Sequence, residues 1–169
     1  KEVNAGNGLI ADKSQPGSPA SISDVGLAIS SYIVAVERKL ISRADAISKT
    51  LTTLRFFHSS SQGPEVDATG YKGFYYHFLY MDSGRRAWES ELSTIDSTFL
   101  LVGALTAAAY FDGDTPEERE IRTVAVELYA RADWEWARNA GETVSMGWKP
   151  GCGLLPYRVE GNNEGVFFS

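Results

Sequence analysis

The stretch from Phe99 to Phe111, FLLVGALTAAAYF, is apolar on almost every side of the helix that it predicts. It is too short to cross a bilayer, and it contains Gly103 and Thr106. We therefore expect a helix from about Glu91 to Tyr110 that is buried among other helices. A helix of this kind needs neighbours on all sides, so it constrains the fold more than any other segment does.

The helix that follows has a different character. After Asp112-Gly113-Asp114, the residues Thr115-Pro116-Glu117-Glu118 supply a capping Thr, a Pro at the first helical position and a Glu at the third. We expect this helix to reach about Arg138. Charged side chains are spread among its apolar residues, so one side of it should face water.

Two earlier segments predict another helical pair. Apolar residues keep helical spacing from Val25 to Leu40, after a cap at Ser21 or Ser23. Ser42 then caps a less apolar helix that should end near His58. A buried helix paired with a half-solvated one is what a two-layer ring of helical hairpins requires, although a plain helical bundle shows the same contrast. The pattern therefore predicts an all-α fold of helical hairpins.

The remaining segments predict loops and short strands. Residues 1–20 are rich in Gly, Pro, Ser and Asn and indicate an irregular lead-in. The aromatic segment 72–88, with a turn at Asp82-Ser83-Gly84, predicts a short hairpin or extended loop beside a pocket. From Thr143 the sequence predicts a structured loop with short strands, and a further helix could begin near Asn162. We expect residues 1–169 to form a single domain.

Composition excludes several classes of partner. The formal net charge of −6 argues against a nucleic acid, because phosphate binding needs a basic face. No basic amphipathic stretch indicates a membrane surface. Cys152 is the single cysteine, which excludes a disulfide framework, and we expect it to be a small buried side chain. No Cys and His cluster predicts a metal site, and no cofactor is expected.

Two carboxylates stand where the apolar helix begins. In the first turn, Glu91 would be stabilised by the exposed N–H groups by about 0.3–1 kcal/mol, which gives it a structural explanation besides a functional one. Asp96 should lie more than a turn into the helix. Its neighbours three and four positions away are Leu92, Ser93, Phe99 and Leu100. Because a carboxylate in apolar surroundings is costly without a partner, Asp96 should contact another element or face a polar cavity.

Other side chains suit a sugar-binding site, in which aromatic rings stack on pyranose rings while carboxylates and Arg bind hydroxyl groups. The candidates are the aromatics Tyr75, Trp88, Trp148 and Tyr157, the basic residues Arg85, Arg86 and His77, the rim residues Asp12 and Lys13, and Glu164. Each has an ordinary alternative, namely core packing, surface charge, a turn Asp or a capping Glu. Carboxylates and aromatics together favour glycoside hydrolysis, with inversion and retention both open.

Five segments, taken in order, resemble the bacterial glucoamylase-like family, which includes endo-β-1,2-glucanases. They are GLIADKS, PASISDVGLAIS, VERKLISRADAISKTLTTLRFF, GYKGFYYHFLYMDSGRRAWESELSTIDSTFLLVGALTAAAYFDGD and GWKPGCGLLPYRVEGNNEG. The resemblance covers nearly all of the chain. It implies an (α/α)6 toroid of which this chain is the N-terminal part, under half of the domain. It also implies action on β-1,2-linked glucan and favours a periplasmic or extracellular location.

The resemblance also assigns roles to particular residues. The family's WxGYNEA-like motif falls on Val159–Gly165, so it makes Glu164 the general acid. Here Val159, Asn162 and Gly165 replace the Trp, Tyr and Ala of that motif. The ELSTID segment, Glu91–Asp96, would lie at the substrate cavity. A partner base would then come from the C-terminal half of the domain.

These inferences combine into one hypothesis, a β-glucan-acting glycoside hydrolase. Its catalytic residues are Glu164 and Asp96, and its substrate-binding residues are Glu91, Asp12, His77, Arg86, Trp88, Trp148 and Tyr157. The alternatives are an inactive carbohydrate-binding relative and a helical interaction module. Half a ring would leave apolar edges, so we expect the rest of the domain or a second copy as a partner, besides the glucan.

Overall fold

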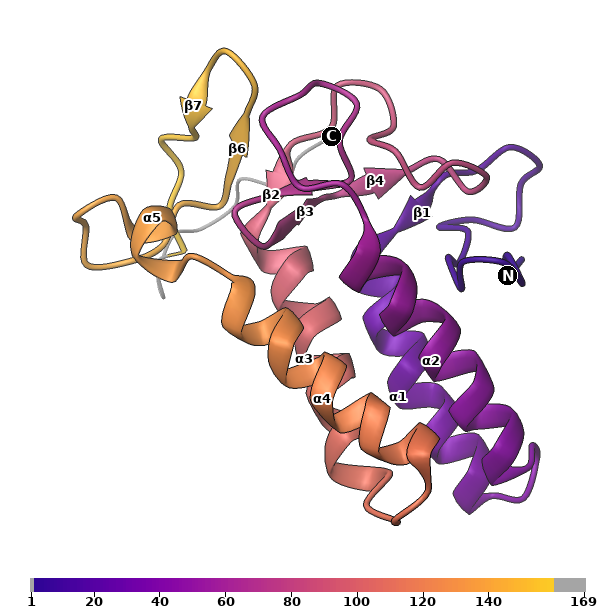
Figure 1. The fold of residues 1–169 in the computed structure, drawn as a ribbon. Coiled ribbons are helices and arrows are strands. Elements are labelled where there is room, and N and C mark those ends of the chain that lie inside the picture. Colours follow the sequence, from indigo (N-terminus) through magenta and orange to yellow (C-terminus); the bar gives the residue numbers. More distant parts are fainter. Residues whose placement is uncertain (1, 160–169) are drawn as a thin grey trace.

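A computed structural model describes residues 2–159, in which four long helices stand side by side beneath a layer of loops and short strands (Figure 1). The helices are α1 (Ile22–Glu37), α2 (Arg43–Ser59), α3 (Thr94–Tyr110) and α4 (Pro116–Arg131). A short helix, α5 (Trp134–Arg138), follows α4. The cap at Ser42 is confirmed, because its side chain accepts a hydrogen bond from the Asp45 N–H group, and Thr115 caps α4 in the same way.

The loop layer contains two small antiparallel sheets. In the larger one the order is β2 (Gly70–Tyr71), β3 (Phe74–Tyr76), β5 (Leu92–Ser93), β6 (Gly147–Lys149) and β7 (Gly153–Leu154). In the other, β1 (Ala20–Ser21) pairs with β4 (Phe78–Leu79). The expected short strands after Thr143 are therefore confirmed. In the segment 72–88, for which a hairpin or an extended loop was expected, Leu79 forms an antiparallel bridge with Arg86 across the turn. A fold described as all-α is not, because the sheet joins segments that are distant in the sequence, in pieces too short to show an alternating pattern.

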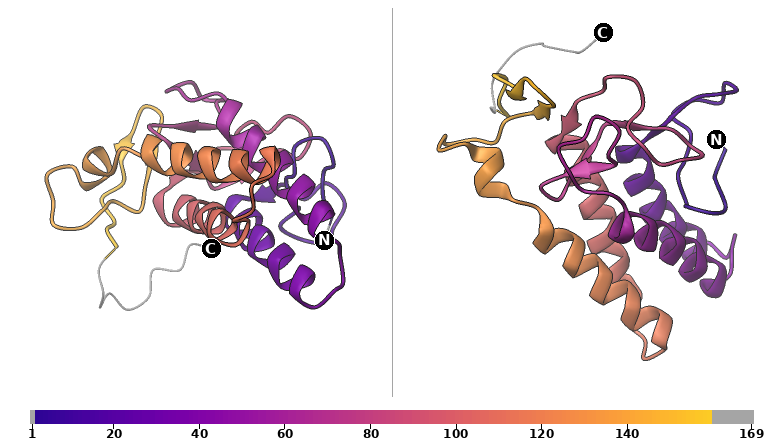
Figure 2. Two further views of the ribbon diagram at one scale, coloured as in Figure 1. Left: turned by 60° about the horizontal axis from the view of Figure 1, so that its bottom comes forward. Right: turned by 45° about the horizontal axis from the view of Figure 1, so that its top comes forward.

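The four long helices form two layers. Figure 2 (left) shows α2 and α4 lying over α1 and α3. Within the inner layer α1 and α3 approach very closely at two glycines. A Cβ atom on Gly26 would lie 2.3 Å from the Phe99 carbonyl oxygen, and one on Gly103 would lie 2.3 Å from the Gly26 carbonyl oxygen. Only residues without a side chain permit this crossing, so the two glycines set the distance between the inner helices.

Ion pairs join the outer helices. Arg55 of α2 makes a two-pronged contact with Glu120 of α4, and His58 Nε2 lies 2.9 Å from Glu127 Oε2. These pairs are largely exposed, so each contributes little to stability. Glu118 is different, because its side chain is almost fully buried beside the Arg43 guanidinium at 2.6 Å. The outer layer is thus held by polar contacts at its surface and by apolar contacts with the inner layer.

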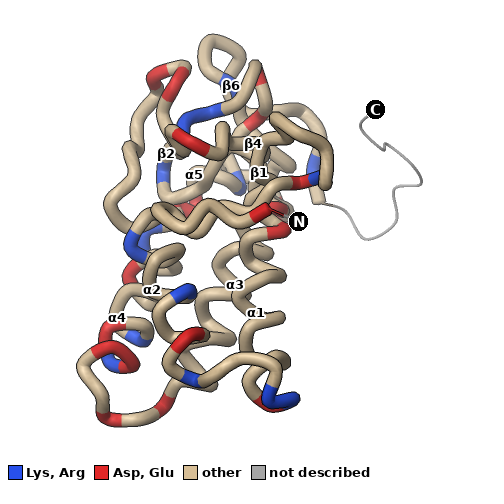
Figure 3. The backbone as a smooth tube through the Cα atoms, turned by 90° about the vertical axis from the view of Figure 1, so that its right-hand side faces the viewer, with Lys and Arg blue, Asp and Glu red and all other residues tan. Residues whose placement is uncertain are grey.

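The inner helices keep one uncovered apolar side. Within residues 2–159, α3 is not buried on all sides, contrary to the expectation. Phe99 and Val102 are each about half exposed, as are Leu27 and Val34 of α1. Figure 3 looks onto α1 and α3, whose middle turns carry no charged residue. Apolar side chains are thus exposed along two adjacent helices on one face of the inner layer.

Several boundaries differ from the expectation. The helix expected from Glu91 begins at Thr94, because Leu92 and Ser93 pair with β3 and β6 as a strand. The helix expected to reach Arg138 ends at Arg131, and α5 follows after a two-residue break. The described part of the lead-in, residues 2–20, has no helix, yet it packs against the core, since Leu9, Ile10 and Ala11 are buried. Cys152, expected to be buried, is exposed between β6 and β7, where Gly151 and Gly153 turn the chain.

Candidate active site

His77 lies at the centre of a cluster of acidic side chains in the loop layer. It is the single residue between β3 and β4. Its backbone N–H group donates to the Glu91 carbonyl oxygen at 2.9 Å, and its own carbonyl oxygen accepts from the Ile22 N–H group at 3.2 Å. His77 is therefore fixed between the start of α1 and the segment that leads into β5 and α3.

Each ring nitrogen of His77 lies near a carboxylate. Nδ1 is 2.9 Å from Glu91 Oε1, and Nε2 is 3.7 Å from Asp96 Oδ2. The three side chains are 28%, 25% and 19% exposed, so the cluster is partly accessible to solvent. The His77 ring is also stacked on Phe78, with ring centroids 3.9 Å apart. The folded chain thus brings together three of the predicted site residues.

Asp96 occupies a different helical position from the one expected. It is the third residue of α3, where its N–H group donates to Ser93 Oγ at 3.1 Å and Ser93 Oγ donates to Asp96 Oδ2 at 2.5 Å. This is a capping arrangement with Asp in place of Glu. The prediction that Asp96 lies more than a turn into the helix is therefore wrong. The related prediction, that it contacts another element, is confirmed by His77.

Glu91, unlike Asp96, does not lie in a helix, because it directly precedes β5. Its hydrogen bond to His77 lowers the pKa of Glu91 against the opposing effect of burial, and the positive charges of His77 and Lys149 lower it further. Burial by itself would lower the pKa of His77. The hydrogen bond to Glu91 and the negative charges of Asp96, Glu91 and Asp12 outweigh burial and raise it above 6.5.

These shifts predict how the pair stabilises the fold as the pH changes. The raised pKa of His77 gives stability that is complete below pH 6.5 and is lost as the pH rises through the folded-state pKa. The lowered pKa of Glu91 gives stability that is complete above pH 4.5 and is lost as the pH falls through its folded-state pKa. We therefore expect a Glu91→Gln variant to be most destabilised between pH 4.5 and 6.5. Urea unfolding of both proteins at several pH values measures this, and a difference that does not vary with pH would contradict it.

Two further predicted residues border the cluster. Asp12 belongs to the lead-in before α1, and its charge acts on His77. Its N–H group donates to the Pro19 carbonyl oxygen at 2.8 Å, and Lys13 beside it is mostly exposed. Trp88 is 62% exposed and lies 5.7 Å from the Phe78 ring, centroid to centroid. Figure 3 shows acidic residues gathered at this end of α1 and α3.

Three other candidates, Arg86, Tyr75 and Arg85, contact residues outside this cluster. Arg86 is 8% exposed, donates from Nε to the Ser90 carbonyl oxygen at 2.6 Å and stacks over the Tyr76 ring. Tyr75 is fully buried, which raises its pKa to about 12. Arg85 pairs with Asp67 at the surface. For Tyr75 and Arg85 the structural alternative therefore explains the side chain.

The structure describes two of the three candidate residues after Thr143. Trp148 of β6 packs against Tyr71 and Trp136, with ring centroids 4.8 and 6.3 Å away, and is half-buried. Tyr157 is 47% exposed, and its carbonyl oxygen accepts from the Met146 N–H group. Glu164 and the expected helix near Asn162 lie outside the described residues.

Sequence reasoning missed several residues that build the cluster. Ser93 caps α3 and holds Asp96, while Phe78 supports the His77 ring. Lys149 acts on Glu91 from β6. The signal for Ser93 is its spacing to Asp96, which repeats the spacing of Ser42 and Asp45. No local pattern links Lys149 to Glu91, because that proximity comes from the pairing of β5 with β6.

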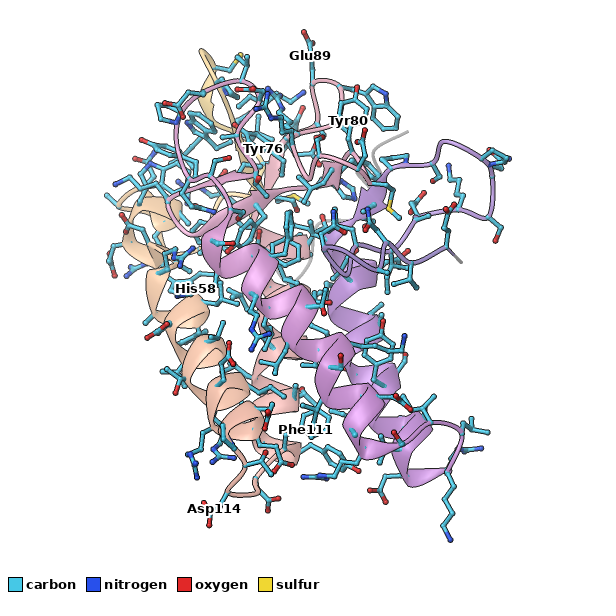
Figure 4. All side chains as sticks on the ribbon, turned by 45° about the vertical axis from the view of Figure 1, so that its right-hand side comes forward. His58, Tyr76, Tyr80, Glu89, Phe111 and Asp114 are labelled. Carbon is cyan, nitrogen blue, oxygen red and sulfur yellow. The ribbon has the colours of Figure 1, made fainter. Side chains whose placement is uncertain are left out.

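Figure 4 shows how the loop layer and the far end of the helices are separated. Glu89 and Tyr80 lie at one end of the molecule, and Phe111 and Asp114 lie at the other.

Within residues 2–159, no helix is long and apolar enough to span a membrane. In the same range, no three His, Cys, Asp or Glu residues are grouped so that they could hold a metal ion.

Comparison with known proteins relates this architecture to enzymes that act on β-1,2-glucan. No protein-family model matches the chain. A curated relative, the exo β-1,2-glucooligosaccharide sophorohydrolase (non-reducing end) of Parabacteroides distasonis, is 22% identical over 128 residues. That match covers 73% of this chain and 17% of the relative. The chain therefore spans a small part of this enzyme's length.

Solved structures match more completely. A candidate glucoamylase of Bacteroides uniformis has a TM-score of 0.83 at 24% identity, covering 96% of this chain and 39% of its own. The endo-β-1,2-glucanase of Chitinophaga pinensis, in complex with sophorotriose and glucose, has a TM-score of 0.80 at 18% identity. That match covers 95% of this chain and 40% of the glucanase. The resemblance seen in the sequence is confirmed, and the chain has the fold of the glucoamylase-like glycoside hydrolases over the part of their length that it spans.

Proposed function

We propose that this chain is part of a glycoside hydrolase that acts on β-1,2-linked glucan by carboxylate acid and base catalysis. The observation that carries the proposal is the meeting of Glu91 and Asp96 at the His77 ring. Within residues 2–159, each carboxylate keeps one oxygen, Glu91 Oε2 and Asp96 Oδ1, that accepts no side-chain hydrogen bond. Two such oxygens at one partly exposed position suit the hydroxyl groups of a sugar or a water molecule.

The curated relative and the solved glucanase support the substrate class, since both are named for β-1,2-linked glucans. We assign Asp96 and Glu91 to the binding of substrate or of the catalytic water. The general acid is Glu164 on the strength of the family resemblance. In this assignment one carboxylic acid protonates the leaving oxygen, while a carboxylate on the other side of the bond activates the attacking group.

Trp88 is the residue best suited to stack on a sugar ring. Its backbone has φ = 53°, which is unusual for a residue with a large side chain and costs about 1–2 kcal/mol. Its ring is nevertheless 62% exposed, so the strain does not serve to bury it. An aromatic side chain held in a strained conformation next to a carboxylate cluster is consistent with a binding surface.

The same proposal extends to the architecture. We infer that α1 and α3 belong to the inner ring of an (α/α)6 toroid, and that α2 and α4 belong to its outer ring. The half-exposed side chains of α1 and α3, Leu27, Val34, Phe99 and Val102, support this arrangement. In a complete ring further helical hairpins would cover them. A stable and dispersed monomer made only of these 169 residues would count against it.

The direct test is hydrolysis by the complete protein encoded by the reading frame that contains this chain. We would incubate the wild type and a Glu164→Gln variant with linear β-1,2-glucan and with a panel of other glucans, and measure reducing ends. Release from β-1,2-glucan that is lost in the variant supports both the substrate and the acid. Activity that survives in the variant removes Glu164 from this role and leaves the enzyme class intact.

If no glucan is hydrolysed, the same experiment distinguishes the two alternative functions. If no glucan is cleaved but the glucan raises the melting temperature, the chain belongs to a carbohydrate-binding protein. If there is neither cleavage nor a thermal shift, the proposed function is wrong and an interaction module is favoured.

A further inference from the structure

The backbone and the ring of His77 are both held in place by neighbouring residues. Its backbone is held by Glu91 and Ile22, and its ring lies flat against Phe78. Nδ1 and Nε2 are thereby directed at two carboxylates that come from different segments of the chain, Glu91 before β5 and Asp96 in the first turn of α3. Within residues 2–159, the His77 ring is the one group that pairs with both carboxylates.

The charges around the ring favour its doubly protonated form. The charge of Asp12 acts on it from the lead-in before α1, and Glu91 and Asp96 lie at its two nitrogens, while Lys149 of β6 acts on Glu91. Three negative charges surround one imidazole. Only an imidazolium carries a positive charge and an N–H group on both nitrogens. Only the charged form can therefore donate to Glu91 and pair at the same time with Asp96, which lies 3.7 Å from Nε2.

We propose that His77 is a positioning residue of this site, whose imidazolium bridges Glu91 and Asp96 and holds the two carboxylates in a fixed relation to the substrate. This role rests on the proposed function and deepens it. His77 acts through the two carboxylates, so it does not itself have to touch the sugar. The direction of the pKa shift of His77 described above, which is upward, favours this bridge.

The bridge has a consequence for the dependence of the rate on pH. When the pH rises through the pKa of His77, the imidazole keeps one N–H group and releases one of the two carboxylates. We therefore expect kcat/KM for glucan to fall on the alkaline side with the titration of this histidine. A residue that only filled space would give no such limb.

Two variants of the complete protein test the bridge, because each preserves one half of it. The amide nitrogen of His77→Asn replaces Nδ1 and can still reach Glu91, whereas that of His77→Gln replaces Nε2 and can still reach Asp96. Both variants should lose kcat/KM by about 10²-fold, since a misplaced catalytic group costs that much. Both should also lose the alkaline limb that belongs to the histidine.

The chain offers a matched control. His58, the other histidine of this sequence, pairs with Glu127 at 2.9 Å on the outer surface between α2 and α4. His58→Gln removes an imidazole from a carboxylate in the same manner but away from the cluster. It should keep the wild-type rate and the wild-type pH profile.

The outcomes separate this inference from the proposed function. If the wild type hydrolyses glucan and both His77 variants keep its rate and alkaline limb, the bridge is wrong and the hydrolase stands. If the wild type cleaves no glucan, the hydrolase is wrong and the positioning role falls with it. If the His77 variants do not fold, NMR titration of the histidine in the wild type and in Glu91→Gln decides. A pKa that does not fall in Glu91→Gln would overturn the bridge.

Discussion

Replacing Asp96 with Asn is expected to lower glucan hydrolysis by the complete protein by about 10²-fold, because a misplaced substrate or catalytic water costs about that much. Asn has nearly the same size, and its side-chain oxygen can still accept the hydrogen bond that Ser93, the cap residue of α3, donates to Asp96. The variant loses the negative charge that faces His77 Nε2. Rates of reducing-end release at saturating and at low glucan measure the effect on kcat and on KM.

Asp45→Asn is the control for this variant, because Asp45 has the same place in α2 that Asp96 has in α3. Its N–H group donates to Ser42 Oγ at 3.0 Å, and Ser42 Oγ donates to its carboxylate at 2.6 Å. Both substitutions remove a favourable charge from a helix N-terminus, at a cost of about 0.3–1 kcal/mol in stability. Only Asp96→Asn should lose activity. Equal activity in the two variants would mean that Asp96 is a capping residue and nothing more.

The largest expected effect on stability comes from Gly26→Val. Its Cβ atom would lie 2.3 Å from the Phe99 carbonyl oxygen and 2.6 Å from the Leu100 Cα atom, which are backbone atoms of α3 and cannot rotate away. Overpacking of this kind typically costs about 1–3 kcal/mol, and the two branches of Val place the effect at the upper end. Removing a helical glycine gains at most about 1 kcal/mol, so the loss dominates. Urea unfolding of the complete protein measures the difference.

Ser48→Ala separates this steric effect from helix propensity. Ser48 is exposed on α2, so the substitution improves helix propensity without a new contact across the inner layer. It should leave the unfolding free energy unchanged or slightly raised. A Gly26→Val protein as stable as Ser48→Ala would mean that the two inner helices do not approach as closely as their glycines indicate.

Much of the helical framework was predictable from local signals. The caps at Ser42 and Thr115 are confirmed because a hydroxyl group followed three residues later by a carboxylate satisfies helix N–H groups locally. α3 begins three residues later than the sequence predicts. Ser93 is its cap, and Leu92 and Ser93 pair with β3 as a strand, which no local signal indicates.

The sheet and the cluster were less predictable. Leu92 pairs with both Tyr76 and Trp148, and strands of two or three residues carry too few positions for a period of two to be visible. Glu91, Asp96 and His77 were each proposed from residue type and surroundings. Their meeting at one ring depends on how β3, β5 and α3 are arranged, which no spacing in the sequence encodes. The role of Arg86 remains a prediction, since its described contacts are with Ser90 and Tyr76.

The sheet order also bears on how the chain assembles. The inner and outer helices lie within residues 22–131, whereas β5 is completed by β6, which begins at Gly147. Pairing between such distant segments first costs the entropy of closing a long loop, and the favourable free energy of the strand contacts follows only after closure. During synthesis the helical layers can therefore form first. The edge of the sheet next to Glu91 can pair only after β6 has been synthesised. Acquisition of a working site would then lag behind acquisition of helical structure in a refolding experiment.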